Sequence, residues 1–152
     1  MTFKITPWLL KISLAALFIG FSLADAAELT AAKIAEIRKA ADQGDARAQN
    51  NLGACYQYGW GGVQSNTEAM KWYHKSADQG YVYAQQNLGC FYSNWKNVEA
   101  YKWYLLAASQ GHKNAKINVW ALERRLSPKQ RAEGQKAANE WQAEFIKKSS
   151  QK

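Results

Sequence analysis

The sequence predicts an all-α protein: a short right-handed α–α solenoid of antiparallel helix pairs, with capping helices at both ends. The first observation behind this prediction is a repeat, with a spacing of 36 residues from Leu52 to Leu88 and of 31 from Gly80 to Gly111. Spacings of this size are typical of solenoids whose unit is a helix–turn–helix pair. The second observation is that apolar residues between the repeated motifs recur at three and four positions, the period of one helix face.

Three short motifs mark equivalent positions in successive units. Ala-Asp-Gln-Gly at 41–44 returns at 77–80 and, as Ala-Ser-Gln-Gly, at 108–111. Asn-Leu-Gly at 51–53 returns at 87–89, with a degraded copy at 118–120, and Lys-Trp-Tyr at 71–73 returns at 102–104. The second unit is therefore shorter than the first.

Within the first full unit, glycines, small residues and aromatics follow a fixed order: Leu52, Gly53, Tyr56, Gly59, Gly61, Val63, Ala69, Trp72, Tyr73, Ala77, Gly80 and Ala84. This order resembles the Sel-one-like repeats, which are relatives of the tetratricopeptide repeats, over roughly residues 37 to 120. The second unit departs from the pattern, because it lacks the glycine-rich turn between Tyr92 and Ala100.

Residues 1–26 are predicted to be a secretory signal peptide. Lys4 and Lys11 precede residues 12–23, which are apolar apart from two serines, and Ala24-Asp25-Ala26 then forms a small-x-small cleavage site. The apolar stretch is shorter than the ~20 residues of a membrane-spanning helix, which favours cleavage after Ala26 over an uncleaved anchor. We therefore expect a periplasmic or secreted protein without stable membrane insertion. It would have a repeat domain at 27–126 and a C-terminal capping helix with a basic tail at 127–152.

The chain is basic, with a net charge of +8 that falls to +7 when two lysines and one aspartate leave with the signal peptide. Export and the scattered distribution of the basic residues argue against nucleic acid as a partner. An anionic partner outside the cytosol, such as an acidic protein, anionic lipid or cell-wall polymer, fits the charge. Solvated helix faces explain it equally well.

The two cysteines, Cys55 and Cys90, would enter a compartment that permits disulfides. When the two units are aligned, the cysteines occupy adjacent positions of equivalent helices. Cys55 is expected nearer the buried face and Cys90 nearer the opposite one. A disulfide needs Cα atoms roughly 5.5 Å apart, closer than neighbouring helices usually come. The sequence leaves the pairing open.

Seven helices are expected, at 28–43, 45–58, 67–79, 81–92, 98–110 and 112–126, with the last starting after Ser127. The helices at 45–58, 81–92 and 112–126 are the first helices of successive units, here called first-type helices. Those at 67–79 and 98–110 are second-type helices. The residues predicted to face inward are Ile34, Ile37, Ala41, Ala48, Leu52, Cys55, Tyr56, Ala69, Trp72, Tyr73, Ala77, Ala84, Leu88, Phe91, Ala100, Trp103, Tyr104, Ala107, Ala115, Val119, Ala138, Trp141 and Phe145.

Helix ends carry recognisable capping residues. Thr30 and either Ser65 or Asn66 are predicted N-caps, and Gly44 is predicted to end its helix in the left-handed conformation. Ser127, followed by Pro128 and Gln130, predicts a capping box at the start of the closing helix.

Two positions are expected to control helix packing. Gly53 weakens its helix by about 1 kcal/mol, a cost that makes sense if a neighbouring helix approaches closely there. Trp120 occupies the equivalent position in the third unit. Its bulk prevents such an approach, so the array should stop after this helix.

No catalytic constellation is present in the sequence, and no enzyme activity, cofactor or metal is predicted. His74 and His112 are not at metal-ligand spacing from the cysteines. The glycines at 59–62 lack the Gly-Lys-Ser/Thr ending of a phosphate loop. Some cysteine-rich relatives are described as β-lactamases, but the serine-x-x-lysine motif is missing here.

The partner-binding surface is predicted on the side of the first-type helices that lies opposite the packed face, which is concave in tetratricopeptide-like stacks. Its residues are Arg47, Asn50, Gln57, Tyr58, Tyr83, Gln86, Ser93, Asn114, Ile117 and Arg124. The alternative is that these positions are merely solvated. Trp60 and Trp95 lie in turns. The sequence does not decide whether these two side chains form an exposed contact surface or pack locally within the turns.

The resemblance implies an exported protein–protein interaction scaffold or adaptor that holds another protein or peptide. Two alternatives are a periplasmic immunity protein that neutralises a toxic effector and a protein that binds an envelope polymer through its positive charge.

Overall fold

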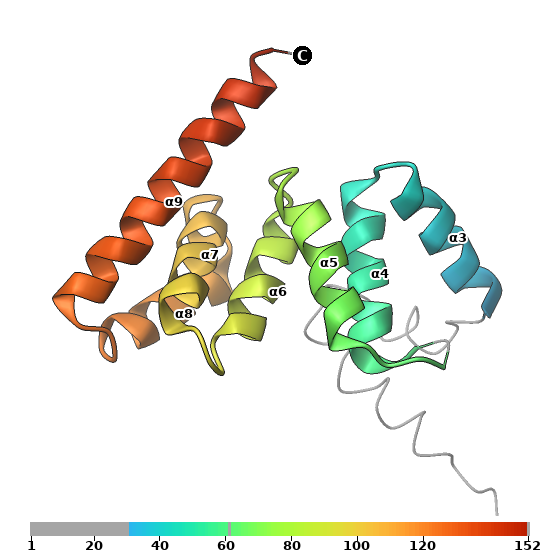
Figure 1. Cartoon of the computed structure of the whole chain (residues 1–152), viewed down its shortest axis with the longest axis horizontal. Coiled ribbons are helices and arrows are strands. Elements are labelled where there is room, and N and C mark those ends of the chain that lie inside the picture. The colour runs from blue at the N-terminus through green and yellow to red at the C-terminus, as the bar shows by residue number, and fades with distance from the viewer. Residues whose placement is uncertain (1–30, 61, 152) are drawn as a thin grey trace, which may run out of the picture. The chain divides into compact units, whose positions relative to one another are not determined.

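The computed structural model describes residues 31–60 and 62–151, which form seven α-helices and no strand (Figure 1). The predicted all-α fold, with helices packed in sequential pairs, is confirmed. The predicted signal peptide at 1–26 and the predicted cap Thr30 lie outside the described residues. Within the described part of the chain, no helix combines the length and apolarity needed to cross a bilayer.

The helices are α3 (Ala31–Asp42), α4 (Ala46–Tyr58), α5 (Asn66–Ala77), α6 (Val82–Tyr92), α7 (Asn97–Ser109), α8 (Lys113–Glu123) and α9 (Pro128–Ser149). Most described ends lie within two residues of the predicted ones. The exception is α8, which ends at Glu123 instead of Leu126. The backbone turns there, with the N–H groups of Arg125 and Leu126 both donating to the Leu122 carbonyl, and the turn buries Leu126.

The chain divides into two compact units, Met1–Trp72 and Tyr73–Lys152, and the division falls within α5. In the first unit α3 packs against α4. Seven of the predicted inward residues are buried in this unit and supply its core: Ile37, Ala41, Ala48, Leu52, Cys55, Ala69 and Trp72.

Helix α7 is central to the second unit, because it packs against α6, α8 and α9 (Figure 1). Two glycines permit the close contacts. A Cβ added to Gly89 of α6 would overlap the Tyr104 ring of α7, and one added to Gly134 of α9 would lie 2.7 Å from Cδ1 of Tyr101. Gly89 is the equivalent of Gly53, so the predicted role of this repeat position is found in the second unit.

The same corner joins a second-type helix to the next first-type helix three times, if α3 is counted as the lone second helix of an incomplete unit. Gly44, Gly80 and Gly111 have φ angles of +95°, +82° and +89°, a region that disfavours residues with a Cβ. The residue after each glycine donates its N–H to a carbonyl five positions earlier, as in a Schellman motif. These bonds are Asp45 to Ala40, Tyr81 to Ser76 and His112 to Ala107.

Side-chain caps fix several helix starts as predicted. Ser65 Oγ accepts from Glu68 N–H (3.2 Å), which identifies Ser65 as the cap of α5. Ser127 and Gln130 form the predicted capping box of α9. Two further caps were not predicted: Asp45 accepts from Ala48 N–H, and His112 Nδ1 accepts from Ala115 N–H at 3.2 Å.

Candidate functional site

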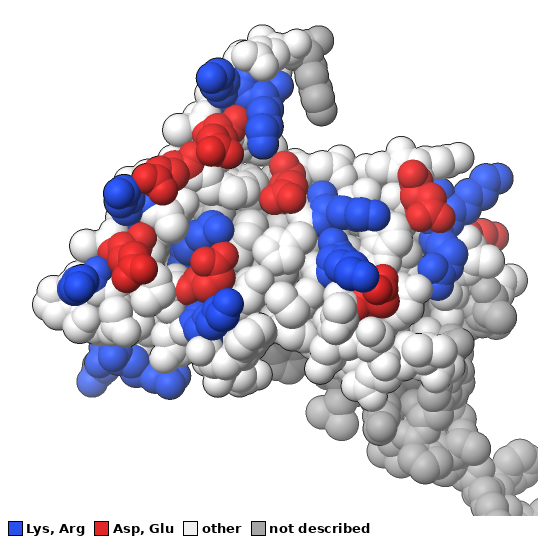
Figure 2. All heavy atoms as spheres, in the orientation of Figure 1, with Lys and Arg blue, Asp and Glu red and all other residues white. Residues whose placement is uncertain are grey.

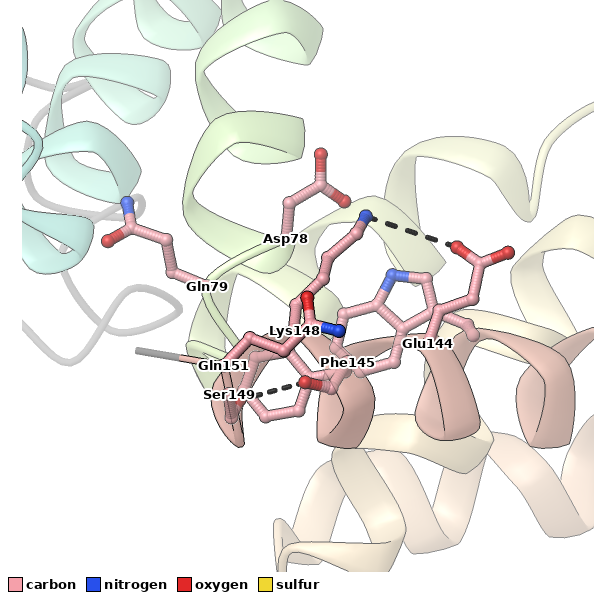
Figure 3. A pocket seen from close by; sticks show the side chains of 8 residues that line it. Asp78, Gln79, Glu144, Phe145, Lys148, Ser149 and Gln151 are labelled. Carbon is pink, nitrogen blue, oxygen red and sulfur yellow. Dashed lines mark hydrogen bonds and ion pairs between the residues drawn. The ribbon is translucent and has the colours of Figure 1, made fainter.

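A groove of about 690 Å³ lies in the second unit, between the end of α5 and the C-terminal half of α9 (Figure 3). Trp141 and Phe145 line it as a stacked pair, with ring centroids 5.1 Å apart and planes inclined by 9°. Asp78, Glu144 and Lys148 surround the rings. The Lys148 ammonium lies 4.0 Å from the Glu144 carboxylate, a weak exposed ion pair. The groove thus combines an apolar platform with charges of both signs.

The groove exists because α9 returns to the corner that follows α5. The Phe145 ring covers Gly80, whose added Cβ would lie 2.8 Å from the ring Cζ. Trp141 meets Trp103 of α7 edge to face at 6.1 Å. Trp141 and Phe145 were predicted only as inward residues of the closing helix. The structure leaves both half-buried, so each serves the core and the groove wall together.

An aromatic and polar cluster lies beside the groove. His74 packs edge to face on Trp103 at 5.5 Å, and its Nε2 lies 3.0 Å from the Tyr92 hydroxyl. Glu99 accepts from Trp103 Nε1 (2.9 Å) and from Lys102 Nζ (3.0 Å). Burial lowers the pKa of His74 and raises the pKa of Tyr92, so both rings are neutral at neutral pH. The cluster is a structural network that holds α5 and α7 in register within the second unit.

A smaller cavity of about 240 Å³ occupies the first unit and is lined by Ile34, Arg38, Leu52, Cys55, Tyr56, Trp60 and Val63. The Arg38 guanidinium lies over the Tyr56 ring at 5.5 Å. Burial raises the pKa of the Cys55 thiol to about 12, so this thiol is protonated and unreactive at neutral pH. Both cysteines are free.

Among residues 31–60 and 62–151, no three His, Cys, Asp or Glu side chains lie together in a way that could hold a metal ion.

In the first unit the predicted contact residues differ in their exposure to solvent. Arg47 is exposed, and Gln57 and Tyr58 are half-buried. Asn50 is only 1% exposed, so its predicted position on an open surface is wrong. The pattern at 100° per residue placed it opposite the core, but that side of α4 is also covered. Trp60 is buried as well, at 4% exposure, and stacks on Tyr58 at 5.3 Å. Of its two open alternatives, local packing is the one observed.

In the second unit most predicted contact residues remain accessible. Tyr83, Trp95, Asn114, Ile117 and Arg124 are exposed, and Ser93 is half-buried. Gln86 is the exception at 8% exposure, so its predicted exposure is wrong. Its Nε2 donates to Sγ of Cys90, one turn further along the same helix, at 3.3 Å.

Sequence reasoning did not include Lys116 and Trp120 in the predicted surface, although both are exposed on α8. A signal was available in the 31-residue offset of the repeat. Lys116 stands where Gln85 is buried, and Trp120 stands where Gly89 is buried. The change from an amide and a glycine to a lysine and a tryptophan marks a face that is no longer internal.

Comparison with known proteins gives a consistent result. The family model of the Sel1 repeat matches residues 37–45, 46–81 and 82–112. A crystal structure of c5321, a protective antigen of uropathogenic Escherichia coli with an SLR fold, superposes with a TM-score of 0.68 at 24% identity, over 91% of this chain. The chain spans 30% of the length of that protein.

A Sel1 repeat protein from Oxalobacter formigenes superposes with a TM-score of 0.56 at 29% identity, covering 76% of this chain and 89% of that protein. A search of curated protein sequences found no match.

Proposed function

Because the chain belongs to the Sel1 repeat family, we propose that it is an interaction adaptor that holds another protein or peptide on its first-type helices. The observation that carries this proposal is the exposure of large apolar side chains on the repeat helices of the second unit. Tyr83, Ile117 and Trp120 are all exposed. Ile117 and Trp120 lie three residues apart and share one side of α8, and contiguous exposed apolar surface in a folded protein marks interaction sites.

The chemistry of these positions agrees with protein recognition. Tyrosine, tryptophan and arginine are the residues enriched at the energetic centres of interfaces. Tyr83 packs edge to face on His112 at 5.4 Å, and Arg124 lies over Trp120 at 5.0 Å. Both aromatic rings are thus held in place before a partner arrives, which reduces the entropy lost on binding.

We also propose that the adaptor acts outside the cytosol, in the periplasm or beyond it. The basic, apolar and small-residue order of residues 1–26 supports this proposal.

Capture from an envelope extract tests the adaptor function. The bait is compared with a variant that carries Arg47→Glu, Tyr83→Ser and Arg124→Glu, all at exposed positions. A matched control changes three exposed residues of α9, with Lys129→Glu, Ile146→Ser and Lys147→Glu. We expect the wild type and the control to recover one common partner and the first variant to lose it. If the first variant is folded by circular dichroism and still recovers as much of the partner as the wild type, these surfaces do not bind the partner.

A further inference from the structure

From the exposed face of α8 we infer a docking site for one kind of partner, an acidic amphipathic helix. The inference rests on the proposed adaptor function and makes it specific. Ile117 is 63% exposed and Trp120 is 60% exposed. They lie three residues apart and therefore share one side of the helix. Arg124 follows Trp120 by one further turn and lies over its ring, so the three side chains form a continuous strip.

The repeat shows what normally covers this strip. With the 31-residue offset, Lys116, Ile117 and Trp120 correspond to Gln85, Gln86 and Gly89 of α6, which are all buried. Helix α7 supplies part of that cover, because its Tyr104 ring lies against Gly89. A helix therefore covers the equivalent place on α6, and the same place on α8 is open.

The side chains on α8 define the occupant. Since Trp120 replaces glycine, an incoming helix must present small side chains at the point where α7 presents Tyr104. Apolar residues next to them would bury Ile117, as when an amphipathic helix lays its apolar face on a partner protein.

Charge selects an acidic occupant. Lys113, Lys116 and Arg124 are exposed around the strip. The only acid of α8 is Glu123, which is half-buried and accepts a hydrogen bond from the Tyr101 hydroxyl at 3.0 Å. The face is therefore positive, unlike α9, where acidic and basic side chains alternate along the helix (Figure 2). Two copies that met through this face would bring like charges together, a costly arrangement.

The test measures binding of labelled peptides by fluorescence anisotropy at physiological salt. The probe is an amphipathic peptide of about four helical turns, with alanine and leucine on one face and glutamate on the other. A peptide with lysine in place of glutamate and a poly-glutamate of equal charge serve as comparisons. We expect the acidic amphipathic peptide to bind at least about ten-fold more tightly than either comparison, because only this peptide combines both features.

Matched variants locate the site. Ile117→Gln and Lys116→Glu should each weaken binding by about ten-fold, and Ile146→Gln and Lys147→Glu on α9 should change it less than about two-fold. Ile146 is a fair control because it is 59% exposed.

Three results would overturn the inference: equal binding of poly-glutamate, equal effects of the α8 and α9 variants, or a dimer in sedimentation that Ile117→Gln dissociates. If the peptide fails to bind but envelope extracts still yield a partner that a variant with only Arg47→Glu and Tyr83→Ser loses, the adaptor function stands and only the α8 site is wrong.

Discussion

Gly89 allows α6 and α7 to pack closely because it has no side chain. Alanine in a helix is normally more stable than glycine by about 1 kcal/mol. Here an added Cβ overlaps the Tyr104 ring, and overpacking of this kind costs about 1–3 kcal/mol. We therefore expect Gly89→Ala to lower the free energy of unfolding measured in urea. Gly111→Ala is the comparison, because it introduces backbone strain at φ +89° without meeting any atom within 4 Å. An increase in stability in Gly89→Ala would contradict the close approach of α7.

The two histidines predict how stability depends on pH. Burial lowers the pKa of both His74 and His112, so the folded protein binds protons less readily than the unfolded chain. Their contribution is present above the ordinary histidine pKa of about 6.5 and is lost as the pH falls below it. Protonation of His112 also removes the acceptor that caps α8.

We expect the free energy of unfolding to be lower at about pH 5.5 than at about pH 7.5. Carboxylates remain largely ionised at both pH values and therefore contribute little to the change. The double variant His74→Gln, His112→Asn should show a much flatter profile, since asparagine retains a cap. The prediction would be wrong if the double variant kept the full dependence of the wild type in parallel urea titrations.

At the level of the element, the start of α9 depends on its capping box. Ser127 Oγ accepts from Gln130 N–H at 3.3 Å, and the Gln130 side chain accepts from Ser127 N–H at 3.0 Å. Ser127→Ala should cost about 1 kcal/mol of stability. Gln130→Ala should destabilise the Ser127→Ala variant by less than it destabilises the wild type, because the two hydrogen bonds act together. Ser149→Ala, at the exposed far end of the same helix, should be nearly neutral. If the two serine variants unfold at the same urea concentration, the box does not stabilise the protein.

The elements were predictable because local signals set them. Glycines at the corners, apolar residues at helical spacing and the serine before Pro128 all act within a few residues of themselves. Contact surfaces were less predictable, because exposure depends on which helices lie across from one another. Asn50 and Gln86 lie opposite the predicted inward face of their own helices and are nevertheless buried. Trp60 lies in a turn, and its burial follows from stacking on Tyr58 and from the cavity it lines, neither of which has a periodic signal.

At the scale of the whole molecule, the proposed export would determine which form of the chain reaches the proposed partner. We expect the intact mass of the exported protein to correspond to a start at Ala27, because Ala24-Asp25-Ala26 fits a signal-peptidase site. Ala24→Leu removes one of the small residues and should leave the precursor uncut, whereas a conservative change outside the site, Lys39→Arg, should not affect processing. A wild-type envelope protein that retained residues 1–26 would contradict the prediction.

The two kinds of connection between helices differ in how much they can vary. The corners at Gly44, Gly80 and Gly111 repeat the same left-handed geometry and the same backbone hydrogen bond. The turns within the units, at 59–65 and 93–96, differ in both length and sequence. A unit of this fold can therefore form with a shorter turn between its two helices. A fluorophore, affinity tag or inserted epitope should be tolerated at Asn94, whereas the same insertion beside Gly80 would disturb a corner that Phe145 covers.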